Sequence, residues 1–118
     1  MGMHKLFRFN FTITMKIIRN KYIPFKGFRA INLFGILFVR GNAKIDNVSL
    51  NHEAIHTAQM KEMLYIFFYI WYGIEWLIRL FMEGNAYRNI SFEREAYKHQ
   101  NELNYDKLRN RFAWLKYI

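Results

Sequence analysis

The chain has 118 residues, a formal net charge of +9 and no cysteine. This length suits one domain with a hydrophobic core, and a composition that is 53% hydrophobic and 19% aromatic excludes a chain that is disordered throughout. The lack of cysteine excludes disulfides and thiolate chemistry, so imidazole and carboxylate groups must hold any bound metal. We expect a single domain over residues 1–118, with residues 1–14 as a weakly ordered extension.

The positive charge is spread from Lys5 to Lys116 and suits anionic lipid, acidic peptides or nucleic acid as partners without choosing between them. No recognised nucleic-acid motif surrounds Arg109 and Arg111, so we expect no nucleic-acid partner. The N-terminus lacks an uninterrupted apolar stretch and a small-residue cleavage site, and so predicts no secretory signal. The expected location is cytoplasmic, with membrane association left open.

The segment before residue 41 predicts short β-strands. MKIIR (15–19) and FRAINLFGILFVR (28–40) are rich in β-branched and aromatic residues, and we expect the second to be one strand bent at Gly35. Residues 41–47 have the composition of a loop. Ser49 or Asn51 is the expected cap of the helix that follows.

The aromatic stretch MLYIFFYIWYGIEWLIRLFM (63–82) predicts a helix that is buried or lies at an interface. Its uncharged part ends at Ile74 after about a dozen residues, whereas a transmembrane span needs about twenty. Glu75 and Arg79 are spaced to pair on one face of this helix. An anionic membrane surface or a second copy of the chain is the partner that such a helix would suit.

A polar helix is predicted over SFEREAYKHQNELNY (91–105), after a loop at residues 84–90. Glu93 and Glu95 fall in its first turn, where carboxylates suit the positive end of the helix dipole. The final residues 111–118 are apolar enough to dock on the rest of the domain.

The most informative motif is HExxH at residues 52–56. On a helix, His52 and His56 point the same way one turn apart, which is the spacing that zinc requires. Glu53 then lies beside the metal, where it can act as a general base toward an activated water. The competing interpretation is two structural histidines on a helix. About one such chain in a hundred would contain the motif by chance, so the motif alone does not exclude this interpretation.

A catalytic zinc usually has a third protein ligand, and no His or Asp follows His56 at a suitable spacing. Glu93 and Glu95 are the next candidates. Spacing alone does not decide between them, since Glu95 forms a separate pair with His99 four residues on.

HExxH followed by FEREAY resembles the gluzincin metallopeptidases, in which a glutamate of a later ExxA motif completes the zinc site. The match is Glu93 to Ala96, with Tyr97 where the family commonly has Asp. Because the chain is short, it resembles the compact minigluzincins, and it is also similar to short Bacteroidetes proteins that share the NHE, IHT and FEREAY blocks. The resemblance implies a zinc-dependent peptide hydrolase with His52, His56 and Glu93 as ligands, and a rim strand at residues 31–40 that can pair with an extended peptide.

Chain length adds a condition to this interpretation. One straight helix from His56 to Met82 would be about 40 Å long, and the eleven residues from there to Glu93 could barely retrace it. The zinc site therefore requires a break between His56 and Met82. Gly73 is the residue best suited to it, and a turn nearer Lys61 is the alternative.

Further residues are candidates for supporting roles. Gln59, Glu62 or Glu95 could accept the proton on the second nitrogen of a ligating imidazole. Efficient hydrolysis also needs a group that stabilises an oxyanion, for which the candidates are Tyr87, Arg94, Tyr97 and His99.

Together these features predict a small zincin-like α+β domain of short strands, an active-site helix, an aromatic helix and a glutamate-bearing helix. The expected activity is a zinc metallopeptidase acting on a peptide or protein. Two alternatives remain. One is a membrane-surface or protein-interaction module with a structural or vestigial zinc site. The other is an inactive domain that needs a partner subunit to complete its cleft.

Overall fold

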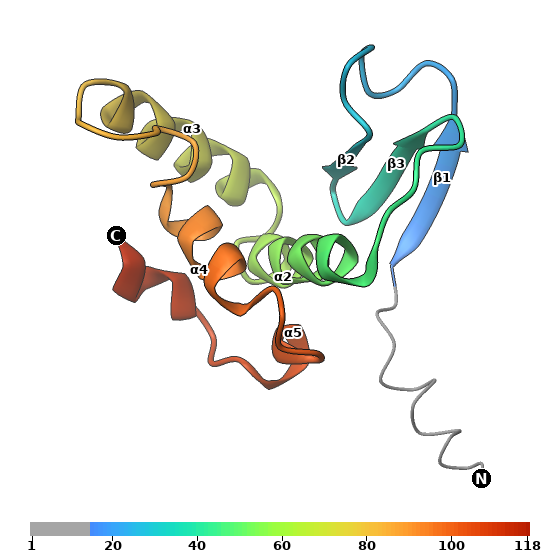
Figure 1. Ribbon diagram of the computed structural model, residues 1–118. Helices are drawn as coiled ribbons and strands as arrows, with labels where there is room; N and C mark the ends of the chain where they lie inside the picture. The colour runs from blue at the N-terminus through green and yellow to red at the C-terminus, as the bar shows by residue number, and fades with distance from the viewer. Residues whose placement is uncertain (1–14) are drawn as a thin grey trace, which may run out of the picture.

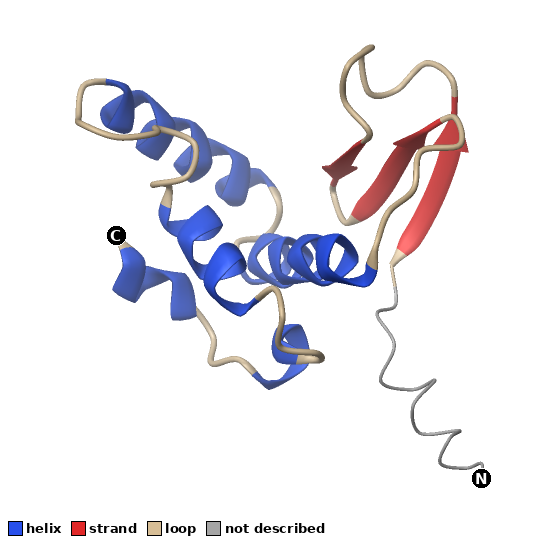
Figure 2. Ribbon diagram, viewed as in Figure 1, coloured by secondary structure: helices blue, strands red, loops and turns tan. Residues whose placement is uncertain are grey.

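A computed structural model describes residues 15–118, so the expectation for residues 1–14 lies outside the described part. It shows a small α+β domain in which a three-stranded sheet precedes the helices, as predicted (Figures 1 and 2). In chain order the elements are β1 (Lys16–Asn20), β2 (Ala30–Leu33), β3 (Ile36–Arg40), α2 (Asn47–Glu62), α3 (Ile66–Leu80), α4 (Ser91–His99), α5 (Tyr105–Leu108) and the 3-10 helix η1 (Ala113–Tyr117).

The sheet has β3 at its centre, between β1 and β2. β1 runs parallel to β3, with Ile18 opposite Phe38, and β2 runs antiparallel to it. Leu37 and Val39 of β3 are fully buried, as the alternation of a half-buried strand requires. β2 is left as an edge strand beside the helices.

The prediction of one bent strand over residues 28–40 was wrong, because this segment is a β-hairpin. Phe34 and Gly35 form its two-residue turn, with φ of 54° and 89°. Positive φ at both central positions matches the twist of the flanking strands, although such turns rarely place a phenylalanine there. Asn32 stabilises the turn by accepting a hydrogen bond from the Gly35 amide at 3.0 Å.

Helix α2 is capped by Asp46, so the prediction of Ser49 or Asn51 as cap was wrong. The Asp46 carboxylate accepts a hydrogen bond from the Ser49 amide at 2.8 Å. Asn51 lies inside the helix, and its side-chain amide donates to the carbonyls of Gln100 and Glu102 at 2.8 and 2.9 Å. Asn51 thereby ties α2 to the chain that follows α4.

The break that a metal site requires lies between α2 and α3, which meet at a bend of 111°. Leu64 and Tyr65 make the turn with positive φ, and the Tyr65 amide donates to the Met60 carbonyl at 2.7 Å. The alternative of a turn near Lys61 is thus confirmed. The preference for Gly73 was wrong, since Gly73 lies within α3.

Among residues 15–118, no single helix combines the length and apolar composition needed to cross a membrane. The bent pair of α2 and α3 passes that test only when the two helices are joined.

The hydrophobic core lies between α3, α4 and the C-terminal segment. Its buried members are Met60, Phe68, Ile90, Phe92 and Trp114. Trp114 of η1 packs on Phe92 with 4.6 Å between ring centroids, which confirms the predicted docking of residues 111–118.

Helix α4 begins at Ser91, as predicted, but ends at His99 rather than continuing to residue 105. Its first turn is capped from another helix, because the buried Glu75 of α3 accepts hydrogen bonds from the Ser91 amide, at 2.8 Å, and from the Ser91 hydroxyl. The predicted pairing of Glu75 with Arg79 is therefore wrong. Glu75 turns inward, and the Arg79 guanidinium contacts Met82 instead.

Candidate metal centre

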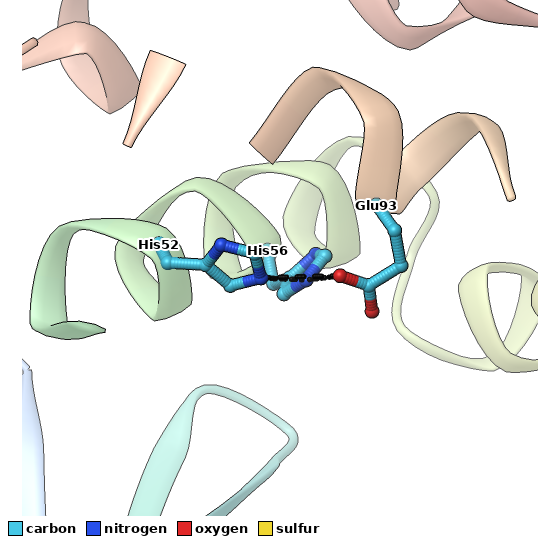
Figure 3. Close-up of side chains that lie close together, drawn as sticks. All are labelled: His52, His56 and Glu93. Carbon is cyan, nitrogen blue, oxygen red and sulfur yellow. Dashed lines mark hydrogen bonds and ion pairs between the residues drawn. The ribbon is translucent and has the colours of Figure 1, made fainter. Parts of the chain in front are cut away.

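Three buried side chains from two helices converge on one point. His52 and His56 lie one turn apart on α2, and their Nε2 atoms are 3.1 Å from each other. Glu93 approaches from α4 and places Oε1 at 3.1 Å from the Nε2 of His52 and 3.0 Å from that of His56 (Figure 3). Within residues 15–118 this is the only group of three His, Asp or Glu side chains arranged closely enough to hold a metal ion.

The spacing of these three atoms fits a bound ion. Ligands bound tetrahedrally at about 2.0 Å from an ion lie about 3.3 Å from one another. The observed separations of 3.0 to 3.1 Å differ from this by a few tenths of an ångström, which small side-chain rotations can supply.

The hydrogen bond of Gln59 to His56 fixes which imidazole nitrogen of His56 carries the proton. The amide nitrogen of Gln59 donates to the Phe92 carbonyl at 3.0 Å and to Glu95 at 2.9 Å. Its oxygen therefore faces Nδ1 of His56, at 2.8 Å, and accepts the proton on that nitrogen. Nε2 of His56 is left with a free lone pair, as a metal ligand requires. Gln59 thus fills the supporting role for which it was a candidate.

Gln100 holds His52 in the same way. Its side-chain oxygen accepts from Nδ1 of His52 at 2.9 Å, and its backbone carbonyl is held by Asn51. Gln100 could not be predicted from the sequence, because it lies 48 residues from His52 and only the fold of α4 against α2 brings them together.

When both imidazoles are neutral, three acceptor atoms thus face each other, and such a group needs a positive charge at its centre. In the metal-free protein a proton serves. Burial lowers the pKa of His56, but the ionised Glu93 outweighs burial and raises that pKa to about 9. The facing imidazole and the bonds to both histidines hold the Glu93 pKa well below its usual range, despite burial. These three side chains could therefore hold a cation in place of the proton.

Tyr72 of α3 orients Glu93. Its hydroxyl donates to Oε2 of Glu93 at 2.7 Å, which leaves Oε1 to face the imidazoles. Burial and the negative charge of Glu93 raise the pKa of Tyr72, so this hydroxyl stays protonated and keeps donating. Sequence reasoning missed Tyr72, because its aromatic neighbours indicate only a core or interface residue.

Glu95 does not join the three converging residues. It is fully buried and accepts hydrogen bonds from Arg109 at 2.6 and 2.9 Å, Tyr105 at 2.8 Å and Gln59. The same guanidinium also donates hydrogen bonds to the Glu62 carboxylate at 3.0 and 3.2 Å. Burial raises the pKa of Glu95, but the bond from Arg109, with those of Gln59 and Tyr105, outweighs it and lowers the pKa. Glu95 therefore acts on His56 only through Gln59.

The remaining candidates lie at different distances from the site. The ring of Tyr97 packs edge-on against His52, with 4.5 Å between centroids, and Arg88 stacks on Tyr97. His99 is engaged elsewhere, since its ring nitrogens bond Glu102 and Tyr117. Arg94 donates to the Tyr117 carbonyl at 2.6 Å on an exposed face of α4.

One side of the cluster opens into a cleft of about 770 Å³. Glu53, His56 and Glu93 form its polar end, and Tyr87 also lines it. Burial, followed by the negative charge of Glu93, raises the pKa of Tyr87, so its hydroxyl remains a hydrogen-bond donor. The opposite wall comes from the sheet and the loop before it, including Ile31 and Asn32 of β2.

The edge strand is tied to the helices at this cleft. The side-chain amide of Asn32 donates to the Glu53 carbonyl and to the Thr57 hydroxyl, each at 3.1 Å. The Phe34 amide at the hairpin donates to the Tyr69 hydroxyl at 2.9 Å. These bonds fix the position of β2 relative to Glu53 and the cluster.

No family model, curated protein or solved structure matches the chain. The assignment of this centre therefore rests on its own geometry, which shows a buried His52, His56 and Glu93 group that could hold a metal ion.

Proposed function

We propose that the chain is a zinc-dependent metallopeptidase of the gluzincin type, with His52, His56 and Glu93 as the zinc ligands and Glu53 as the general base. The observation that carries the proposal is the convergence of two imidazole Nε2 atoms and a carboxylate oxygen from a second helix within 3.1 Å. Two imidazoles and one carboxylate form a donor set that catalytic zinc uses.

The surroundings of the cluster support a catalytic site over a structural one. Structural zinc sites are usually closed by four protein ligands, whereas catalytic sites keep one position open for water or substrate. Here two of the three proposed ligands, His56 and Glu93, line a cleft, and Glu53 lines the same cleft beside them. Glu53 follows a ligand directly in HExxH, at the position where that motif carries its general base.

Zinc, when bound, supplies Lewis acidity, which lets water act as a nucleophile near neutral pH and polarises a carbonyl group. Glu53 takes the proton from the attacking water and passes it to the leaving amine. Gln59 and Gln100 keep both ligating imidazoles in the tautomer with Nε2 free. Tyr72 keeps Glu93 turned toward the imidazoles.

Tyr87 is the candidate that best fits the stabilisation of an oxyanion. It lines the cleft together with Glu53, and its raised pKa keeps its hydroxyl protonated at neutral pH. A neutral donor aimed at developing negative charge contributes most in a site that excludes water.

A substrate is expected to lie along β2. This strand is the edge of the sheet, and its residues line the cleft opposite Glu93. Its free backbone groups can pair with an extended peptide, which would bring a peptide bond past the metal.

Metal content is the first test. The full chain, purified without added metal, is expected to contain about one zinc ion per molecule by elemental analysis. Glu93→Ala should lose most of it, whereas Glu102→Gln, at an exposed carboxylate outside the site, should keep it. Less than a few tenths of a zinc ion per chain, unchanged by Glu93→Ala, would contradict the proposal.

Peptide hydrolysis is the second test, because a structural zinc site would pass the first. Glu53→Gln should keep the zinc and lose hydrolysis of a mixed peptide library by at least about a hundredfold, as expected of a general base. Equal hydrolysis by Glu53→Gln and the unchanged protein would favour the alternative of an interaction module with a structural or vestigial metal.

A further inference from the structure

Helix α3 presents a broad apolar face that nothing in residues 15–118 covers. Taking 100° per residue, its exposed positions span roughly 200° of the helix circumference. Every exposed position in α3 is apolar or Gly73. The two charged residues of the helix lie outside this face. Glu75 is buried and caps α4, and Arg79 lies on the opposite side of the helix. The side chains exposed by 50% or more are Ile66, Phe67, Ile70, Leu77 and Ile78.

The loop between β1 and β2 is a second exposed apolar surface. Residues 21–29 read KYIPFKGFR and interleave aromatic with basic side chains. Tyr22, Phe25 and Phe28 are 74%, 83% and 64% exposed. Lys21, Lys26 and Arg29 are exposed between them.

The loop and α3 lie on opposite sides of the cleft. Phe25 and Phe28 form its wall on the sheet side, and Phe68 and Tyr72 form its wall on the α3 side. Figure 1 shows the loop above the sheet and α3 across from it, with α2 below both. The loop therefore borders the cleft on one side, and α3 borders it on the other through the side of the helix opposite its most exposed residues.

The net positive charge of the chain comes from the part of the sequence that contains this loop. Residues 1–45 hold nine Lys and Arg and no Asp or Glu, whereas residues 46–118 hold nine of each sign. The whole net charge of +9 thus falls in residues 1–45 of the sequence, and seven of these nine charges lie within the described residues 15–45. Such an unbalanced surface attracts anionic lipid headgroups.

We propose that the α3 face and loop 21–29 together bind the surface of an anionic lipid bilayer, with α3 lying in the plane of the membrane. At 1.5 Å per residue, α3 is about 22 Å long, too short for a hydrocarbon core of about 30 Å. An in-plane helix with a wide apolar face, accompanied by aromatic and basic side chains, is the usual architecture of interfacial binding.

Charge argues for a bilayer over a second copy of the chain. Pairing two chains through this surface would bring two cationic loops toward each other, and repulsion opposes association of like-charged surfaces. An anionic bilayer instead complements the positive charge of the lysines in loop 21–29. Its apolar interior accommodates the apolar side chains of both the loop and the α3 face. This proposal does not depend on the peptidase activity or on a bound metal.

The test uses the full chain and flotation with two kinds of vesicle, phosphatidylcholine alone and phosphatidylcholine mixed with phosphatidylglycerol. The protein should float with the mixed vesicles and bind the neutral ones more weakly. Leu77→Asp should weaken partitioning at least about tenfold, because it places a charge on the apolar face that would enter the bilayer. Leu108→Asp is the matched control, since Leu108 is an exposed leucine of α5 outside the surface, and it should bind as the unchanged protein does.

Two further readouts separate the proposal from its competitors. Lys26→Gln should weaken binding to the mixed vesicles about fivefold and leave binding to neutral ones unchanged. Trp76, which is 44% exposed on α3, should be quenched by brominated lipid, and Trp76→Phe should remove most of that quenching. A chain that stays unbound with both vesicles, or equal binding by Leu77→Asp and Leu108→Asp, would overturn the proposal. A lipid-free dimer that Leu77→Asp dissociates would assign the face to a second copy instead.

Discussion

The side-chain amide of Gln59 joins His56 to Glu95. Its oxygen accepts from Nδ1 of His56 at 2.8 Å, and its nitrogen donates to Oε1 of Glu95 at 2.9 Å. Glu95 in turn pairs with Arg109, which lowers the Glu95 pKa and keeps its carboxylate ionised. The orientation of one metal-ligand candidate is thus set by a buried ion pair that does not touch it.

Gln59→Leu tests this connection. The substitution keeps an apolar volume close to that of glutamine, but it frees the His56 ring and leaves a Glu95 oxygen without one partner. We expect zinc affinity to fall about 10- to 100-fold, as for other residues that orient a ligating imidazole. Competition with a calibrated chelator measures it. Glu53→Gln, beside the same metal, is the control and should change the zinc affinity by no more than a few fold. If Gln59→Leu binds zinc as tightly as Glu53→Gln does, the bond from Gln59 to His56 is dispensable.

Arg109→Met should destabilise the fold strongly. The Arg109 side chain is 4% exposed and forms ion pairs with both Glu62 and Glu95, whose side chains are 6% and 0% exposed. Removing the cation leaves two buried carboxylates without their partner, which typically costs about 3 to 5 kcal/mol. Urea denaturation of the metal-free chain measures the loss. Arg111→Met is the control at an exposed arginine and should change the free energy of unfolding little; equal effects of both would contradict a structural role for the ion pair.

Glu75→Gln should weaken both the fold and the metal site. Glu75 accepts from the Ser91 amide and hydroxyl and so fixes the start of the helix that carries Glu93. Loss of a buried, charge-assisted pair of hydrogen bonds costs about 2 kcal/mol. Zinc affinity should fall with it, because Glu93 lies in the first turn of the same helix. Glu83→Gln, at an exposed site just after α3, should alter neither quantity; an unchanged unfolding free energy in Glu75→Gln would refute the capping role.

The metal-free protein should lose stability as pH rises from about 6.5 to about 9. The folded pKa of His56, about 9, lies above the ordinary histidine pKa of 6.5. A raised pKa means that the folded state binds the proton more tightly, so the stabilisation is complete below the unfolded pKa and disappears through the folded one. The loss is of order 3 kcal/mol. Denaturation of the chelator-treated chain at several pH values checks this, and His56→Gln should remove the slope.

Added zinc should act in the opposite direction. Metal binding requires both Nε2 atoms unprotonated, so the stabilisation by zinc should grow over the same pH interval in which the proton leaves His56. Equal stabilisation by zinc at both ends of the interval would mean that the ion binds elsewhere.

Local pattern predicted the parts of the site that lie within one element. The four-residue spacing of His52 and His56 needs only helical geometry. Glu93 followed from the resemblance of FEREAY to an ExxA motif, and spacing alone had left Glu95 open. The required break in the long helix followed from chain length, although its position did not.

The remaining features depend on tertiary contacts that no local pattern encodes. Tyr72 and Gln100 reach the cluster only because α3 and the end of α4 fold back on α2. Glu75 was expected to pair with Arg79 along its own helix, but burial against Ser91 gave it a better partner. The turn at Phe34 escaped prediction, and the turn at Leu64 was expected only as the alternative near Lys61, because both use positive φ at residues other than glycine.

X-ray absorption at the zinc edge of the zinc-loaded full chain tests the central claim most directly. The account predicts four ligands at about 2.0 Å, two of them imidazoles and the others oxygen, with Glu93→Ala changing the oxygen contribution or losing the metal. A zinc shell that lacks two imidazoles, or one that is identical in Glu93→Ala, would show that His52, His56 and Glu93 do not form the metal site.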